Sequence, residues 1–140
     1  MLEGLRFPYT AARTRDGEAV LRAQIPLTLI YHGRSVEVVG LLDSGADVNV
    51  LPYPLGLALG ADWATAAPGV RLSGNLAHVG ARAIIVEAAV GHLKPVRLAF
   101  AWTRAQDVPL LLGQVNFFAE FDVCFFRSQG FLELRRAGER

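Results

Sequence analysis

Apolar and polar residues alternate along most of this chain. Residues two apart lie on one face of a β-strand, so this period predicts strands with one buried face. Many short strands joined by glycine-containing turns indicate an all-β barrel or sandwich. The turns are expected at His32-Gly33-Arg34, Gly91-His92 and Ser128-Gln129-Gly130. The alternation is clearest at Ile25, Leu27, Leu29 and Tyr31; at Ile84, Val86, Ala88 and Val90; at Val96, Leu98, Phe100 and Trp102; and at Phe121, Val123 and Phe125.

Helices are expected to be few and short. One is predicted at about residues 54–59, weakened by Gly56, and one at about residues 114–120, after Gly113. The chain has 140 residues and shows no internal repeat or low-complexity linker. We therefore expect one domain, large enough to bury its own core.

One acidic residue stands at the end of an apolar strand. Residues 38–42 read Val-Val-Gly-Leu-Leu and lead directly to Asp43, after which Ser44 and Gly45 turn the chain into a second apolar run at residues 48–51. Burying a carboxylate at such a place costs several kcal/mol unless the charge is paired, hydrogen-bonded or neutralised. We therefore interpret Asp43 as the functional centre of the chain.

Composition narrows the classes of partner. The formal net charge is +1, which gives no reason to expect nucleic acid or an anionic membrane surface. Although 52% of the residues are hydrophobic, no apolar run reaches the ~18–20 residues of a membrane-spanning helix. The first residues lack the basic and apolar regions of a secretory signal, so a cytoplasmic protein is expected.

Residues that commonly bind metals are scattered. His32, His78 and His92 fall in three separate turns without the spacing of metal ligands, so neither a metal nor another cofactor is expected. Cys124 is the single cysteine, which excludes an internal disulfide. Its apolar surroundings predict that it packs as a small hydrophobic residue.

Two segments carry a resemblance to a known family. Residues 41–47 read Leu41-Leu42-Asp43-Ser44-Gly45-Ala46-Asp47, which resembles the active-site motif of retropepsin-type aspartic proteases. Downstream lies Leu110-Leu111-Leu112-Gly113, followed by Asn116-Phe117-Phe118. This resembles the hydrophobic-hydrophobic-glycine segment that packs behind the catalytic loop in that family.

The resemblance covers about residues 20–135. It implies an all-β fold, a closed β-barrel-like lobe with one short helix near the C-terminus, which dimerises. It also divides the chain into an N-terminal extension at residues 1–18, the protease lobe at residues 19–136 and a tail at residues 137–140. The composition is typical of a stand-alone cellular member of the family.

The resemblance also assigns roles to residues. Aspartic proteolysis uses two carboxylates that share one proton, one activating a water and the other polarising the scissile carbonyl. Asp43 matches the catalytic aspartate, and Ser44 matches the residue whose hydroxyl locks the two catalytic loops together. Gly45, Ala46 and Asp47 match substrate-binding positions: Gly45 lets the substrate backbone approach, and Asp47 accepts hydrogen bonds from it. The alternative for Asp47 is a solvated loop acid.

Members of this family cover their substrate with a hairpin flap. Residues 71–80 are the best candidate, because they lie between the two motifs and lead into a predicted strand. Within them, Gly74, Asn75 and Leu76 are the expected substrate-binding residues. An ordinary surface hairpin is the alternative.

The chain carries one catalytic motif, which is half of a dyad. The resemblance therefore implies an aspartic endopeptidase that hydrolyses polypeptide substrates, with its dyad formed across a homodimer. Two features depart from the family pattern. Ser44 replaces the commoner threonine, and Gln114-Val115-Asn116 lacks a basic residue that in retroviral members pairs with the acid matching Asp47, so the dimer geometry need not be retroviral. The alternative function is a non-catalytic retropepsin-fold module for peptide binding or dimerisation.

Overall fold

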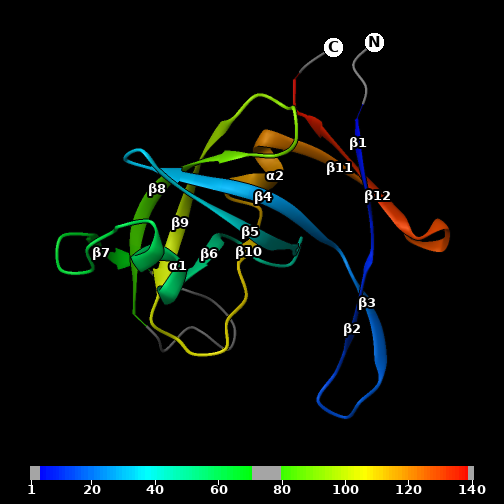
Figure 1. Ribbon diagram of the computed structural model, residues 1–140, viewed down its shortest axis with the longest axis horizontal. Coiled ribbons are helices and arrows are strands. Elements are labelled where there is room, and N and C mark those ends of the chain that lie inside the picture. Colours follow the sequence, from blue (N-terminus) through cyan, green and yellow to red (C-terminus); the bar gives the residue numbers. More distant parts are fainter. Residues whose placement is uncertain (1–3, 71–79, 139–140) are drawn as a thin grey trace.

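Hydrogen-bonded strands close into a barrel that forms the body of the protein (Figure 1). The structure is a computed structural model that describes residues 4–70 and 80–138. Its largest sheet has the strand order β4-β5-β10-β6-β9-β8-β7, and a further pairing between β4 and β8 closes the ring. The strands of this sheet are β4 (Gln24–Tyr31), β5 (Arg34–Leu42), β6 (Asn49–Pro52), β7 (Ala67–Val70), β8 (Ala81–Ala89), β9 (Val96–Thr103) and β10 (Leu111–Leu112). The all-β prediction is therefore confirmed.

Two smaller sheets accompany the barrel in the described chain. One has the order β1-β12-β11, so the first strand of the described chain pairs with the last (Figure 1). The other is a ribbon of β2 and β3 that projects away from the barrel. These strands are β1 (Leu5–Pro8), β2 (Thr10–Arg13), β3 (Ala19–Arg22), β11 (Phe121–Phe126) and β12 (Phe131–Arg136). The predicted domain boundary after residue 18 falls at the turn of the β2–β3 ribbon and stays a prediction.

The predicted turns join the strands where the sequence places them. The β4–β5 hairpin turns through His32 and Gly33, whose φ angles of 47° and 81° are both positive. A two-residue turn with positive φ at both positions matches the twist of the flanking strands, which explains the glycine. Gly130, with φ at 83°, likewise ends a 3-10 turn, η2 (Arg127–Gln129), and leads into β12.

Two short α-helices lie in the described chain, α1 (Tyr53–Ala58) and α2 (Phe117–Glu120). They fall within one residue of the first predicted helical stretch and inside the second. Neither helix is long and apolar enough to cross a membrane, nor is any other helix of the described residues.

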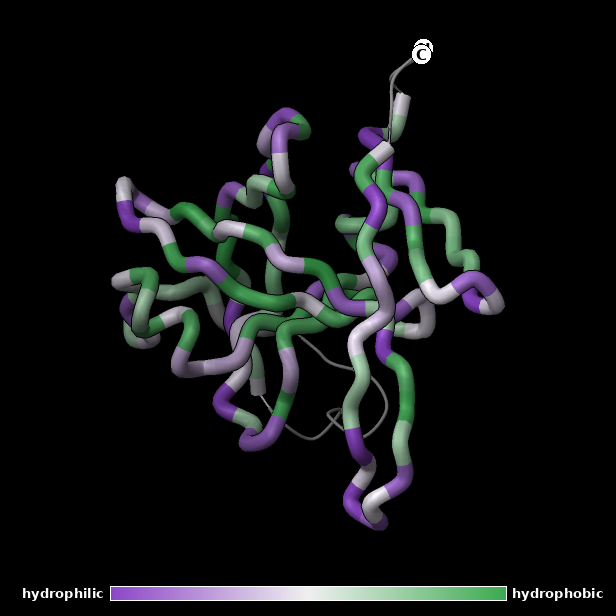
Figure 2. Tube along the Cα trace, turned by 45° about the vertical axis from the view of Figure 1, so that its right-hand side comes forward, coloured by the Kyte–Doolittle hydropathy of each residue, from purple (hydrophilic) through white to green (hydrophobic). Residues whose placement is uncertain are grey.

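One main core fills the barrel. The alternation of hydrophobic and hydrophilic residues, which Figure 2 shows as changes of colour along the strands, becomes an alternation of buried and exposed side chains. Ile25, Leu29 and Trp102 are fully buried, and so are Leu132 and Leu134 of β12, which tie the small sheet to the barrel.

Strand β11 departs from its predicted pattern. Phe121 is buried, but Phe125 is 45% exposed, because the far end of β11 extends beyond the barrel at the edge of its sheet. Cys124 is exposed, opposite Glu133 on the outer face. The prediction that Cys124 packs as a small hydrophobic residue is therefore wrong, because the barrel covers only the other face of β11.

Helix α1 packs on the core through a glycine. A Cβ atom at Gly56 would overlap the indole ring of Trp102, which is fully buried. The Trp102 ring is fixed as well by its Nε1–H group, which donates to the carbonyl of Tyr53 at 3.2 Å. The helix can therefore approach the ring only without a side chain at position 56.

We expect Gly56→Ala to lower the free energy of unfolding by about 1–2 kcal/mol, measured by urea denaturation. Overpacking a core costs about 1–3 kcal/mol, which exceeds the gain of about 1 kcal/mol in helix propensity. Gly80→Ala is the control, since a Cβ atom at Gly80 meets nothing within 4 Å. Equal stability of the two variants would contradict the predicted overlap.

Candidate active site

The carboxylate of Asp43 stands where β5 ends. Its backbone N–H donates to the carbonyl of Leu112 at 3.0 Å, so the residue is held at the barrel wall. One carboxylate oxygen, Oδ1, accepts a hydrogen bond from the N–H of Gly45 at 3.0 Å, and the carbonyl of Asp43 accepts one from Ala46. Asp43 is half-buried, whereas Leu42 before it is buried. The carboxylate is thus hydrogen-bonded within its own turn and still accessible to solvent.

The second motif packs directly behind this loop, as the sequence predicts. Strand β10 pairs with the end of β5 in parallel, with Leu111 beside Leu41 and Leu112 beside Leu42. Beyond β10, the N–H of Gln114 donates to the carbonyl of Ala46 at 2.9 Å. The acid loop is therefore held by backbone hydrogen bonds to one segment distant in the sequence, and β10 of that segment pairs with both flanking strands, β5 and β6.

Further along, the two loops exchange hydrogen bonds in both directions. The N–H of Val115 donates to the carbonyl of Asp47 at 2.8 Å, and the N–H of Asn49 donates to the carbonyl of Val115 at 3.0 Å. Val48 and Val115 form a parallel bridge. The acid loop is consequently fixed along its length.

Gly113 is required by this close packing. A Cβ atom at Gly113 would lie 2.7 Å from the carbonyl oxygens of both Ala46 and Val48. These are backbone atoms, which cannot move aside as the end of a flexible side chain can. The glycine of the second motif therefore sets how closely the two loops approach.

Asn49 is the residue that links these segments through its side chain. It is completely buried, and its Oδ1 accepts a hydrogen bond from the N–H of Gly113 at 2.8 Å. Its Nδ2 donates to the carbonyl of Ala99 at 3.0 Å and to Oδ1 of Asn116 at 3.3 Å. The amide thus connects the acid loop, the second motif and β9.

Asn116 extends the same network. Its Oδ1 accepts a hydrogen bond from the N–H of Ala99, and its Nδ2 donates to the carbonyl of Arg97. The sequence analysis did not identify Asn49 or Asn116 as functional residues. The available signal was an amide inside the apolar run at residues 48–51, since a buried polar side chain needs partners.

Gln114 occupies the place of the basic residue that the family pattern contains. Its Nε2 donates to the carbonyl of Ser44 at 2.7 Å. Through this contact Gln114 holds the acid loop in place. The sequence analysis did not predict this role. Asp47 is exposed and forms no ion pair with a described residue.

A small apolar cluster lies on the same face of the sheet as Asp43. It contains Val50, Ala81 and Ala101, packed against the half-buried Val48, Val108 and Leu111, and it is separate from the main core. Side chains alternate along strands, so Leu111 shares a face with its partner Leu41, and Asp43 follows Leu41 by two positions. This apolar cluster beside the acid, half-buried at Val48, Val108 and Leu111, was also missed, because its members come from separate segments of the chain.

The remaining site residues stand as follows. Ser44, Gly45 and Asp47 are exposed, and Ala46 is half-buried, so residues 43–47 form one accessible loop. Gly74, Asn75 and Leu76 lie outside the described residues, so the flap stays a prediction.

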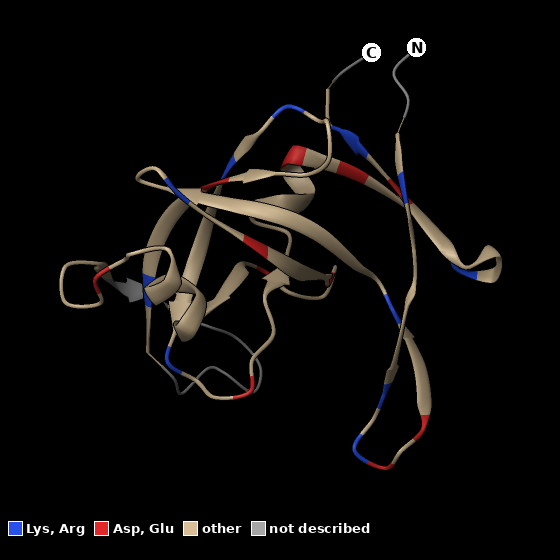
Figure 3. Ribbon diagram, in the orientation of Figure 1, with Lys and Arg blue, Asp and Glu red and all other residues tan. Residues whose placement is uncertain are grey.

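Within the described chain, no three His, Cys, Asp or Glu side chains gather to hold a metal. Acidic and basic residues are spread along the described ribbon, with both signs on several elements (Figure 3).

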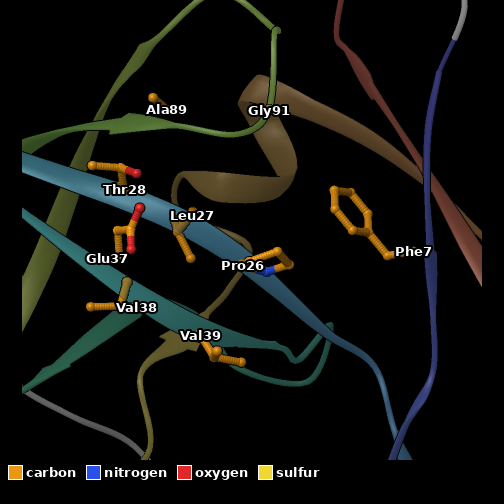
Figure 4. A pocket seen from close by; sticks show the side chains of 9 residues that line it. All are labelled: Phe7, Pro26, Leu27, Thr28, Glu37, Val38, Val39, Ala89 and Gly91. Carbon is orange, nitrogen blue, oxygen red and sulfur yellow. The ribbon is translucent and has the colours of Figure 1, made fainter.

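A separate groove lies between β1 and the barrel. In Figure 4 the ring of Phe7 points from β1 towards Pro26 of β4, with Val39 of β5 below. The groove encloses about 520 Å³, and Glu37 is the one ionisable side chain that lines it. Thr28 is the other polar side chain in its described lining, and Glu37 lies in the middle of β5. Asp43, in contrast, stands on a turn that backbone hydrogen bonds fix, so the loop at Asp43 remains the candidate active site.

Comparison by sequence found no matching family model and no matching curated protein. Comparison by structure found a retropepsin-like aspartic protease from Rickettsia conorii, with a TM-score of 0.60. The alignment covers 96% of this chain and 96% of that chain, at 19% sequence identity. This chain has a retropepsin-like fold. The features that carry this fold in the chain are the closed barrel, the acid loop and the glycine segment that packs behind the loop.

We expect Asn49→Asp to destabilise the protein in a pH-dependent way. Burial would raise the pKa of the new carboxyl group above its value in the unfolded chain, because Ala99 and Asn116 present oxygen atoms to it. The folded state would then bind more protons, so stability is retained below the unfolded pKa and lost as pH rises.

Urea denaturation between pH 4 and pH 7 measures this loss, which should reach about 2–4 kcal/mol at pH 7. Gln129→Glu, an amide-to-acid change at an exposed position, is the control. A pH-independent loss in Asn49→Asp would mean that the side chain at position 49 is not buried against these oxygens.

Proposed function

We propose that this protein is an aspartic endopeptidase whose catalytic dyad forms across a homodimer. The observation that carries the proposal is the accessible Asp43 carboxylate on a loop fixed from behind by the second motif. A catalytic group has to be held within a fraction of an ångström of its working position, and backbone hydrogen bonds from several strands can do this. The apolar cluster beside the loop would receive substrate side chains.

The need for two chains follows from chemistry. A neutral water is a poor nucleophile towards an amide, so one carboxylate must remove its proton while a second, protonated carboxyl donates to the carbonyl oxygen. Two carboxyl groups close enough to share a proton cannot both be ionised, which keeps one proton at the dyad. A twofold axis beside Asp43 supplies the second group from an identical loop.

The proposed reaction balances within this dyad. The ionised carboxylate takes a proton from water as the oxygen attacks the scissile carbon, and the protonated carboxyl gives its proton to the carbonyl oxygen. In the collapse of the resulting gem-diol, one hydroxyl proton returns to the dyad, the amide nitrogen gains a proton and the C–N bond breaks. The products are a carboxylic acid and an amine, and the dyad again holds one proton.

The supporting residues take the following proposed roles. Ser44 would bond across the twofold axis, and Gly45, Ala46 and Asp47 would contact the substrate backbone. Gln114, through Ser44, would position the loop. Gly74, Asn75 and Leu76 are proposed as the substrate-binding part of a flap, and a cytoplasmic location stays an expectation from the sequence.

We expect Asp43→Asn to reduce kcat/KM on a mixed peptide library by at least about a thousandfold, because the variant lacks the group that activates water. Cleavage across pH 4 to 7, read by mass spectrometry, measures the effect. Asp16→Asn, at an exposed turn, is the control and should cleave as the wild type does. No cleavage by a folded, dimeric wild type would favour the non-catalytic module.

Mixing the wild type with an excess of Asp43→Asn tests the shared dyad. If heterodimers carry one carboxylate and are inactive, total activity should fall as the square of the wild-type fraction once subunits have exchanged. Activity is measured at constant total protein, and dimer mass by analytical ultracentrifugation confirms the assembly. Activity proportional to the wild-type fraction would show that each chain has a complete site.

A further inference from the structure

Two arginines stack on one tryptophan at the end of the barrel where β6 and β9 finish. The guanidinium carbon of Arg104 lies 4.5 Å from the centre of a Trp63 ring and 5.3 Å from the Tyr53 ring. That of Arg82 lies 5.0 Å from a Trp63 ring. The ring system is itself fixed, because Trp63 packs edge-to-face on the buried Trp102 at 5.0 Å. The cluster therefore holds two positive charges in defined places.

The two arginines differ in whether their guanidinium N–H groups already donate hydrogen bonds. Arg82 is half-buried, and its Nη1 donates to the carbonyls of Trp63 and Ala66. Arg104 is exposed, and no hydrogen bond or ion pair joins its side chain to a described residue; its contacts are the two rings. A guanidinium held flat on an aromatic face keeps its N–H edge available, and this edge fits a carboxylate with two parallel hydrogen bonds.

Arg104 borders a hollow of about 430 Å³. Pro52 and Tyr53 form one side, and the loop from Arg104 through Asp107 to Val108 forms the other. Asp107 is also on this loop, and it makes no ion pair with Arg104. Arg82 does not line the hollow, but it stacks on the same tryptophan, Trp63, as Arg104 does.

The hollow continues from the apolar cluster beside Asp43. Val108 belongs both to the lining of the hollow and to the apolar cluster, and Pro52 follows Val50 of that cluster by two residues. Because β6 runs antiparallel to β10 and β5, Pro52 lies four residues along the strands and two strands across from Asp43. Strand spacings of about 4.8 Å and 3.3 Å per residue place it on the order of 16 Å from Asp43. An extended peptide covers that distance in roughly five residues.

We propose that this hollow is a substrate subsite for an acidic side chain, with Arg104 as the specificity-determining residue. The inference rests on the proposed protease function, because it places the acid of the substrate relative to Asp43. A twofold dimer would present the hollow twice. The substrate would then favour Asp or Glu about five residues from the scissile bond, on either side of it.

The test uses two peptide pools that differ only in carrying Glu or Gln at these positions. Wild-type protein should cleave the Glu pool with roughly five- to tenfold higher kcat/KM, mainly through KM, and added salt should reduce the preference. Arg104→Gln should abolish it. Arg127→Gln, which removes an exposed arginine stacked on Tyr9, should retain it.

Thermal unfolding of each variant separates a structural role from a binding role. A wild type without preference for Glu would overturn the proposal, and so would an Arg104→Gln variant that keeps the preference. A loss of preference with unchanged thermal stability supports a binding role. If neither pool is cleaved, the proposed protease function fails. Fluorescence anisotropy of labelled pools with Asp43→Asn then tests the subsite by binding alone. Tighter binding of the Glu pool that disappears in Asp43→Asn/Arg104→Gln would support the subsite, and equal or absent binding would overturn it.

Discussion

The position of the acid depends on one constraint, the close approach of the loop after β5 to the segment after β10. Gly113 permits this approach, and the buried amide of Asn49 uses it by accepting the N–H of Gly113. A buried N–H group without a partner costs about 1–3 kcal/mol, so the loops are stable together and costly to separate. Asp43 begins the loop that this contact closes, and no described side chain forms an ion pair with its carboxylate.

The same arrangement gives the strands at the site two different faces. Strands β5, β10 and β6 bury Leu42, Leu112 and Leu51 in the main core and turn Leu111 and Val50 to the opposite face. That second face carries the acid and, around a buried centre, apolar side chains that are half-buried among the described residues. A surface of this kind is stable when another surface covers it, and a bound peptide with a second copy of the chain would do so.

Sequence reasoning succeeds where the physical signal is local. Period-two alternation and positive-φ turns such as His32-Gly33 predict the strands and hairpins, and the acid after an apolar strand marks the loop. It fails where the signal depends on which segments meet. Asn49 was hidden in an apolar run because its partners, Gly113 and Ala99, are far along the chain. Cys124 was misjudged because alternation does not say which face of an edge strand is covered.

The aromatic cluster shows how stability and specificity share residues. Trp102 anchors Trp63 and Tyr53 from within the core, so the rings on which Arg104 rests cannot turn freely. A charged side chain on a fixed ring loses less conformational freedom on binding than one in solvent, which favours recognition by a single exposed arginine. Helix α1 closes this region only because Gly56 lies flat against Trp102. The packing that completes the barrel therefore also sets the geometry of the surface beside the acid.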